Sequence, residues 1–119
     1  MPAKPGTILG LWNCELSNSL IFKAPERLYC LNEVNHLCLQ QNNLNDEHAE
    51  CIGTCLTNSW HNIRHLNLRK NSITDEGALS LLTGIRKSVY LKELFLDMNR
   101  IKTSDTIQAL QISLVFYHT

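Results

Sequence analysis

The chain has 119 residues, 44% of them hydrophobic, and a formal net charge of zero. This length suits one domain with a single core, and the absence of an overall basic field argues against nucleic acid or an anionic membrane as partner. No apolar run is long enough for a signal peptide or a membrane span. We therefore expect a soluble intracellular protein, in the cytoplasm with the nucleus left open.

The sequence repeats one frame along its length. The frame is apolar, two variable residues, Leu, variable, Leu, two variable, Asn, variable, then Leu or Ile, and it contains "HLCLQQNNL", "HLNLRKNSI" and "ELFLDMNRI". Three copies start at Val34, Ile63 and Leu91, and a step of 28 back from Val34 reaches a copy at Gly6. A fixed period of this size is typical of a stacked repeat protein. We predict a tail at 1–5 and repeats over 6–119, starting near 6, 34, 63 and 91.

Each copy is predicted to begin with a short strand and a turn. The Leu-x-Leu pair has the alternation of a strand with one buried face. The side chain at the ninth position then enters the repeat interior, where an amide can bond backbone groups that the bend leaves unpaired. These residues are predicted to stack as a ladder, with the first turn looser because a thiol donates only weakly: Cys14, Asn42, Asn71 and Asn99.

After each turn the apolar spacing becomes helical. Asn45 or Asp46, Thr74, and Thr103 or Ser104 are suitable N-caps. Gly77 is expected where its helix lies closest to the strand layer, the alternative being an incidental surface glycine. Pro25 should break or kink the first helix. The apolar helix positions are Ala49, Ile52 and Leu56 in one copy, and Ala78, Leu79, Leu81, Leu82 and Ile85 in the next.

This frame resembles the leucine-rich repeat family, and its length with Asn or Cys at the ninth position is similar to the ribonuclease-inhibitor-like subclass, also seen in NOD-like receptors and Ran GTPase-activating proteins. The resemblance runs from about Gly6 to about Leu114. It implies an α/β solenoid, a right-handed horseshoe segment with a parallel sheet on the concave side and helices on the convex side. The concave side is the usual recognition surface of the family.

The strand register supplies the candidate protein-binding residues. We expect the side chains that point away from the helices to form a concave surface, whose chemistry runs from aromatic through neutral to basic and then mixed apolar and acidic. Aromatic residues, Met and Arg are enriched in interface cores, although each could equally be an exposed side chain without a partner. The surface comprises Ile8, Gly10, Trp12, Asn13, His36, Cys38, Gln40, Gln41, His65, Asn67, Arg69, Lys70, Glu93, Phe95, Asp97 and Met98.

Charge is uneven between Arg64 and Lys102, where eight Lys or Arg face four Asp or Glu. A partner with an acidic surface is one interpretation, and a solvated basic face is the alternative. We predict no enzyme activity, because the chain lacks HExxH, GxSxG, a phosphate loop and a paired-carboxylate frame.

The cysteines and histidines do not have the spacing of a metal centre. His48, Cys51 and Cys55 share a helical face, but Ser80 and Gly84 occupy the cysteine positions in the next repeat, so we predict no metal and no cofactor. The odd number of cysteines and the absence of an Asn-x-Ser/Thr sequon favour reduced thiols, mostly buried as small apolar side chains. The five are Cys14, Cys30, Cys38, Cys51 and Cys55.

We predict that the chain works as a binding module or scaffold for another protein. The residues do not encode the identity of that protein, its pathway or its tissue. Two alternatives stay open, a regulator of a small GTPase and a fragment or short isoform of a longer repeat protein. The second arises because no polar cap is visible at either end and several C-terminal apolar residues would face nothing. They are Leu110, Ile112, Leu114, Val115, Phe116 and Tyr117.

Overall fold

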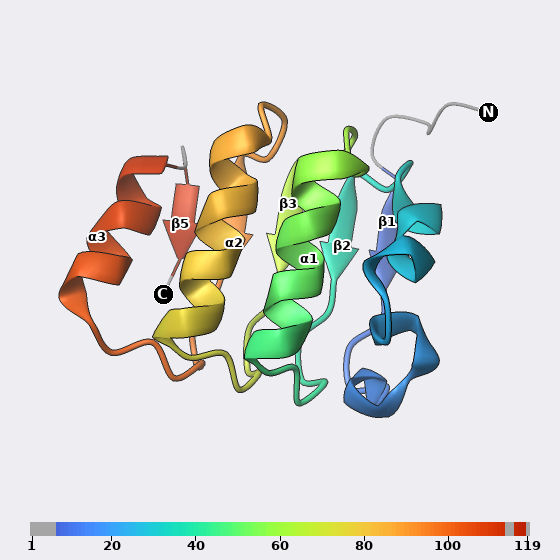
Figure 1. The fold of residues 1–119 in the computed structure, drawn as a ribbon, viewed down its shortest axis with the longest axis horizontal. Helices are drawn as coiled ribbons and strands as arrows, with labels where there is room; N and C mark the ends of the chain where they lie inside the picture. Colours follow the sequence, from blue (N-terminus) through green and yellow to red (C-terminus); the bar gives the residue numbers. More distant parts are fainter. Residues whose placement is uncertain (1–6, 114–115, 119) are drawn as a thin grey trace.

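The computed structural model describes residues 7–113 and 116–118, and shows one parallel sheet with helices along one of its faces (Figure 1). Five strands pair in sequence order. The predicted stack of strand, turn and helix units is confirmed. The strands are β1 (Ile8–Gly10), β2 (His36–Cys38), β3 (His65–Asn67), β4 (Glu93–Phe95) and β5 (Phe116–His118).

Regular helices follow every strand from β2 to β4. They are α1 (Asp46–Asn58), α2 (Asp75–Lys87) and α3 (Ser104–Ser113). The first repeat instead has three 3-10 segments, η1 (Leu16–Asn18), η2 (Leu20–Phe22) and η3 (Pro25–Leu31). Pro25 opens the third of these, as expected for a residue that lacks a backbone N–H and is tolerated at a helix start. The prediction of an irregular first helix is therefore confirmed.

The core lies between the sheet and the helices. Leu37, Leu66 and Leu94 are paired neighbours in the sheet and each is 0% exposed. The second Leu of each frame and the apolar side of each helix complete the core, which also contains Trp60, whose indole N–H donates to the carbonyl of Leu28 at 3.0 Å. Burial of this kind contributes about 1.5–3 kcal/mol for each large apolar side chain before entropy is subtracted.

The ninth-position amides join neighbouring repeats. The Asn71 side-chain nitrogen donates to the carbonyls of Leu39, Leu68 and Arg69, at 3.1, 3.0 and 3.2 Å. Its oxygen accepts from the backbone N–H groups of Asn42 and Leu44, at 2.9 and 3.0 Å. Each such amide thus bonds its own turn and the turn of the preceding repeat.

Asn42 and Asn99 repeat this pattern. Asn42 bonds five backbone groups, including the N–H of Cys14 at 2.8 Å, whereas Asn99 has three such bonds. The Cys14 side chain is exposed and donates to the Trp12 carbonyl at 3.4 Å. Among the described residues, the Cys14 thiol bonds within its own turn.

A second set of contacts between repeats joins the helix starts. Asp46 accepts from the backbone N–H and the hydroxyl of Thr74, at 2.8 and 2.6 Å. Asp75 accepts likewise from the N–H and hydroxyl of Thr103, and from the N–H of Lys102. The Thr103 hydroxyl bond, followed by the Lys102 backbone bond, lowers the pKa of Asp75. Thr74 precedes α2, as the N-cap prediction requires, but its hydroxyl bonds Asp46 and not its own helix.

Glycines determine how closely α1 and α2 approach. A Cβ built on Gly84 would lie 2.4 Å from the carbonyl oxygen of Gly53 and 2.9 Å from its Cα. A Cβ on Gly53 would lie 2.6 Å from the carbonyl oxygen of Ser80. The two helices therefore contact through backbone atoms, a contact that only glycine permits at these positions.

Gly77 allows a close approach, as predicted, but the element that it approaches is not the predicted one. Gly77 is buried, but a Cβ there would meet Asp46 Oδ1 at 2.4 Å and Ile73 Cγ2 at 2.9 Å, so the close approach is to the start of α1 and not to the strand layer. The prediction that Leu79 belongs to the apolar side of its helix is also wrong. Leu79 is 49% exposed, because its position on α2 points away from the sheet.

The expectation for the C-terminal residues is partly wrong. Leu110 is 0% exposed, and residues 116–118 pair with β4 as a fifth strand instead of facing nothing. The predicted tail and Gly6 lie outside the described residues, as do Leu114 and Val115, and the side chains of Ile112, Phe116 and Tyr117 are likewise not described. No helix in the described part of the chain has the length and apolar character needed to cross a bilayer.

Candidate functional site

The face of the sheet opposite the helices carries the predicted binding residues. In β2, β3 and β4 the central Leu is buried while both flanking residues are partly exposed. Parallel pairing aligns Ile8, His36, His65 and Glu93 in one row, and Gly10, Cys38, Asn67 and Phe95 in the next. We call this surface the open face. With the residues that follow each strand it comprises Ile8, Trp12, His36, Cys38, Gln40, Gln41, His65, Asn67, Arg69, Lys70, Glu93, Phe95, Asp97 and Met98.

Two side-chain pairs link β3 and its following turn to β4. His65 Nδ1 lies 2.9 Å from Glu93 Oε1, and Arg69 Nε donates to Asp97 Oδ2 at 2.7 Å. The basic members keep 42% and 43% of their side-chain surface, and the acidic members 23% and 19%. Each carboxylate holds its partner in one orientation, so this part of the face presents ordered donors to solvent.

Two histidine rings lie tilted against each other beside the first of these pairs. The rings of His36 and His65 have centroids 5.2 Å apart, as their shared position in the repeat suggests. Burial lowers the pKa of His36, and the neighbouring His65 lowers it further, against an opposing effect of Glu93. The two rings therefore form a contact between neighbouring repeats, with His36 favoured in its neutral form.

Apolar surface is exposed at both ends of the open face. Ile8 and Trp12 are 65% and 58% exposed near β1, and Met98 is 64% exposed after β4. Phe95, the last residue of β4, is half-buried. Aromatic and Met side chains of this kind are typical of interface centres.

The turn that follows each strand has a left-handed residue. Asn13, Gln41, Lys70 and Met98 have φ of 53°, 58°, 55° and 61°. Only Asn among these tolerates that conformation well, and for the other types it costs about 1–2 kcal/mol. The next residue is the ladder residue, which is buried at Asn42 and Asn71 and half-buried at Asn99, whereas Cys14 is exposed. Beside this turn the Gln40 side-chain oxygen is buried and accepts no hydrogen bond within the described residues.

The cysteines show no metal site in the described part of the chain, where no group of three or more His, Cys, Asp or Glu could hold an ion. Cys51 and Cys55 donate separately to the carbonyls of Phe22 and Pro25, at 3.8 and 3.6 Å. Cys51 and His48 line a cavity of about 340 Å³ between α1 and the 3-10 segments. Contrary to the expectation of mostly buried thiols, Cys55 is buried, Cys38 and Cys51 are half-buried, and Cys14 and Cys30 are exposed.

Thiol reactivity is expected to divide the cysteines. Burial, with a smaller effect of Cys51, raises the pKa of Cys55 to about 12. Because the thiolate is the reactive species, Cys55 should resist iodoacetamide in the folded protein, whereas exposed Cys14 and Cys30 should be alkylated. Mass spectrometry of peptides after timed labelling measures this, with labelling in denaturant as the control. Equal rates at Cys55 and Cys14 in the folded protein would contradict the buried position.

Sequence reasoning missed a cluster at the edge of the sheet. The Arg64 guanidinium lies over the Tyr90 ring, 5.1 Å from its centroid, and His61 contacts the same ring edge-on at 6.0 Å. Arg64 precedes β3 and Tyr90 precedes β4, one repeat later. The repeat alignment, which places the two residues in adjacent loops, was the available signal.

Comparison with known proteins supports the repeat assignment. A family model described as Leucine Rich repeat matches residues 61–82. Among solved structures, the chain is similar to "Leiomodin-1 Actin-Binding Site 2 (ABS2)", with a TM-score of 0.78 and 22% identity over 94% of this chain and 69% of that chain. At this identity the likeness concerns the fold. Comparison with curated proteins gave no match. The repeating frame, the strand-turn-helix stack and the family-model match at residues 61–82 together support a leucine-rich repeat assignment.

Proposed function

We propose that this chain is a non-enzymatic module that binds another protein on its open face. The observation that carries the proposal is the paired surface of His65 with Glu93 and Arg69 with Asp97, placed between exposed Trp12 and Met98. A surface whose donors are already oriented loses less side-chain entropy on binding. The mixture of aromatic, apolar and paired charged groups is the composition of protein interfaces.

The fold gives this proposal its second support. The face is built from short strands fixed by a buried Leu ladder and by the amides of Asn42, Asn71 and Asn99, so its side chains are held on a rigid layer. The structurally similar leiomodin-1 segment is titled an actin-binding site, which makes actin the first defined protein to test. The five free cysteines support a reducing, intracellular location for the interaction, in the cytoplasm or nucleus.

Capture from cell lysate under reducing conditions tests the open face. Wild type is compared with a Trp12→Ala, Met98→Asn variant, which removes two exposed apolar side chains and places a tolerated residue at a left-handed position. The matched control is Leu20→Ala with Leu79→Ala, which removes exposed apolar surface outside that face. All three proteins are first shown to melt alike.

We expect wild type and the control to capture the same partner proteins. The open-face variant should bind them about tenfold more weakly, the effect of removing about 1.4 kcal/mol of binding energy. Sedimentation with filamentous actin is the parallel defined assay. If wild type and the control pellet with actin filaments and the open-face variant does not, actin is the partner. If wild type does not pellet with the filaments, actin is excluded as the partner. Equal retention of every captured protein by the open-face variant and wild type would contradict the proposal.

A further inference from the structure

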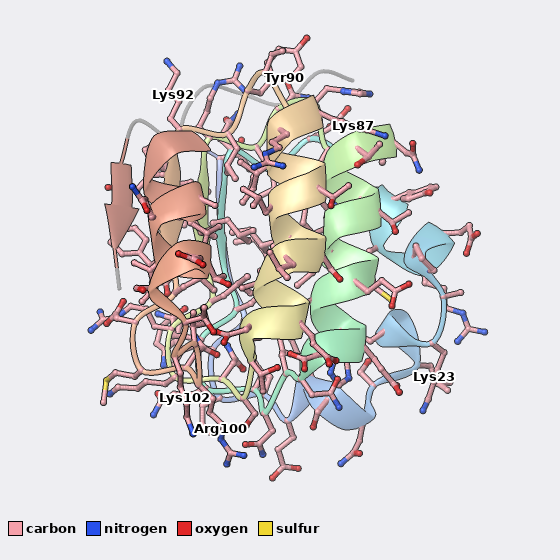
Figure 2. The ribbon with its side chains drawn as sticks, turned by 60° about the vertical axis from the view of Figure 1, so that its left-hand side comes forward. Lys23, Lys87, Tyr90, Lys92, Arg100 and Lys102 are labelled. Atoms are coloured by element: carbon pink, nitrogen blue, oxygen red, sulfur yellow. The ribbon has the colours of Figure 1, made fainter. Side chains whose placement is uncertain are left out.

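Basic side chains gather where α2 ends and where β3 and β4 begin, whereas the loop that leads into β2 at the same edge of the sheet carries Glu33. The segments 59–64 and 88–92, which lead into β3 and β4, contain no Asp or Glu. Figure 2 shows Lys87, Tyr90 and Lys92 at one end of the molecule, with Arg100 and Lys102 at the other. We call this surface the Tyr90 edge. It comprises Arg64, Arg86, Lys87, Val89, Tyr90 and Lys92.

The Tyr90 edge is ordered by its own contacts. Arg64 lies over the Tyr90 ring and also donates from Nη1 to the carbonyls of His61 and Ile63, each at 3.4 Å. The backbone N–H of Lys92 donates to the Arg64 carbonyl at 2.9 Å, so the two basic residues lie on adjacent segments of the backbone. The guanidinium is thus held on an aromatic platform in the free protein.

In the described part of the chain these cations lack carboxylate partners. Among the described residues no ion pair involves Arg86, Lys87 or Lys92, while nearby Glu93 is engaged by His65. The opposite edge differs, because the helix starts there carry Asp46, Glu47, Asp75, Glu76 and Asp105 beside its basic residues. Within the described residues, the Tyr90 edge therefore gathers cations for which no ion pair is found.

Helix-end electrostatics explains only part of this edge. Arg86 and Lys87 lie in the last turn of α2, where positive side chains are favoured by the helix dipole. That effect does not explain Lys92 in the loop. It also does not explain Val89 and Tyr90, which are 83% and 38% exposed between the cations. Exposed apolar and aromatic groups surrounded by unpaired charge indicate a binding surface.

We propose that the Tyr90 edge docks an acidic segment of a protein partner, separately from the open face. Carboxylates of the segment pair with Lys87, Lys92 and Arg64, and an apolar side chain of the segment packs on Val89 and Tyr90. Charge complementarity selects the occupant, because an acidic peptide supplies both carboxylates and apolar groups. A nucleic acid would need a longer basic track and would leave Val89 without a partner.

Fluorescence anisotropy with a labelled peptide of alternating glutamate and leucine tests the proposal. Wild type should bind it with an affinity that falls as salt rises, and the same peptide with lysine in place of glutamate should not bind. The variant Lys87→Glu, Lys92→Glu should lose at least about tenfold in affinity, and Tyr90→Ala about threefold. The open-face variant Trp12→Ala, Met98→Asn should bind like wild type.

The charge-matched control is Arg100→Glu, Lys102→Glu at the opposite edge, which should lose less than about twofold. Circular dichroism confirms folding, and the milder Lys87→Gln, Lys92→Gln pair replaces any variant that fails to fold. An equal loss in the two charge-reversed variants would show a general charge effect and overturn the proposal. The absence of wild-type binding at low salt would also overturn it. Edge-dependent binding to phosphatidylserine vesicles without peptide binding would assign the edge to membranes instead.

Discussion

Replacing Gly84 with alanine is expected to lower the free energy of unfolding by about 2 kcal/mol, because the new Cβ overpacks a backbone contact. Its position lies 2.4 Å from the Gly53 carbonyl oxygen, and no rotamer change can relieve a contact with backbone. The helices α1 and α2 must therefore move apart. The loss exceeds the gain in helix propensity of about 1 kcal/mol that alanine brings. For a chain of this length, thermal melting should shift down by roughly 10 °C.

Neighbouring substitutions separate packing from helix propensity. Thr83→Ala, at the adjacent exposed position of α2, should change the free energy of unfolding by less than about 0.5 kcal/mol. Gly53→Ala should destabilise the protein much as Gly84→Ala does, since its Cβ meets the Ser80 carbonyl oxygen at 2.6 Å. The double variant should lose less than the sum, because one separation of the helices relieves both contacts. A Gly84→Ala protein as stable as wild type would contradict the close helix contact.

Replacing Asn71 with alanine is expected to lower the free energy of unfolding by about 3 kcal/mol, since burying unpaired backbone groups is costly. The side chain makes five hydrogen bonds to backbone groups of two repeats. Alanine leaves these groups without that partner in a site that is 7% exposed. Urea denaturation followed by circular dichroism measures the loss.

The ladder also predicts an order among its members. Asn99→Ala should cost less than Asn71→Ala, because Asn99 makes three bonds where Asn71 makes five. Asn58→Ala is the matched control, an exposed asparagine at the end of α1 whose removal should change stability by less than about 0.5 kcal/mol. Equal effects at Asn58 and Asn71 would contradict a structural role for the ladder.

The repeating frame predicts the strands and their order because its spacing reflects a structural requirement in every repeat. A Leu-x-Leu pair at a fixed period leaves one buried face per strand, so Leu37, Leu66 and Leu94 align. The fifth strand escapes the frame, since Tyr117 pairs with Leu94 at a spacing of 23 residues and no Leu-x-Leu pair is present. That strand is defined by its backbone pairing with β4.

Contacts between repeats are where sequence reasoning is weakest. The backbone approach of Gly53 and Gly84 depends on the distance between helices, which residue identity does not encode. Gly77 was rightly singled out, but its neighbour in the preceding repeat was not. The Arg64 and Tyr90 contact and the Asp75 and Thr103 hydrogen bonds likewise join side chains that lie one repeat apart. The positions of open-face residues were predictable from alternation, whereas their charged pairs required the geometry.

Site-specific photo-crosslinking in cells tests most directly whether the open face contacts a protein partner. A benzophenone amino acid replaces Phe95 on the open face in one protein and Leu79 on the outer side of α2 in another. Both positions accept a large apolar side chain, since Phe95 is half-buried and Leu79 is 49% exposed. We expect a discrete crosslinked protein from position 95 and none from position 79. A protein that crosslinks from position 79 and not from position 95 would place the partner on the helices and contradict binding on the open face.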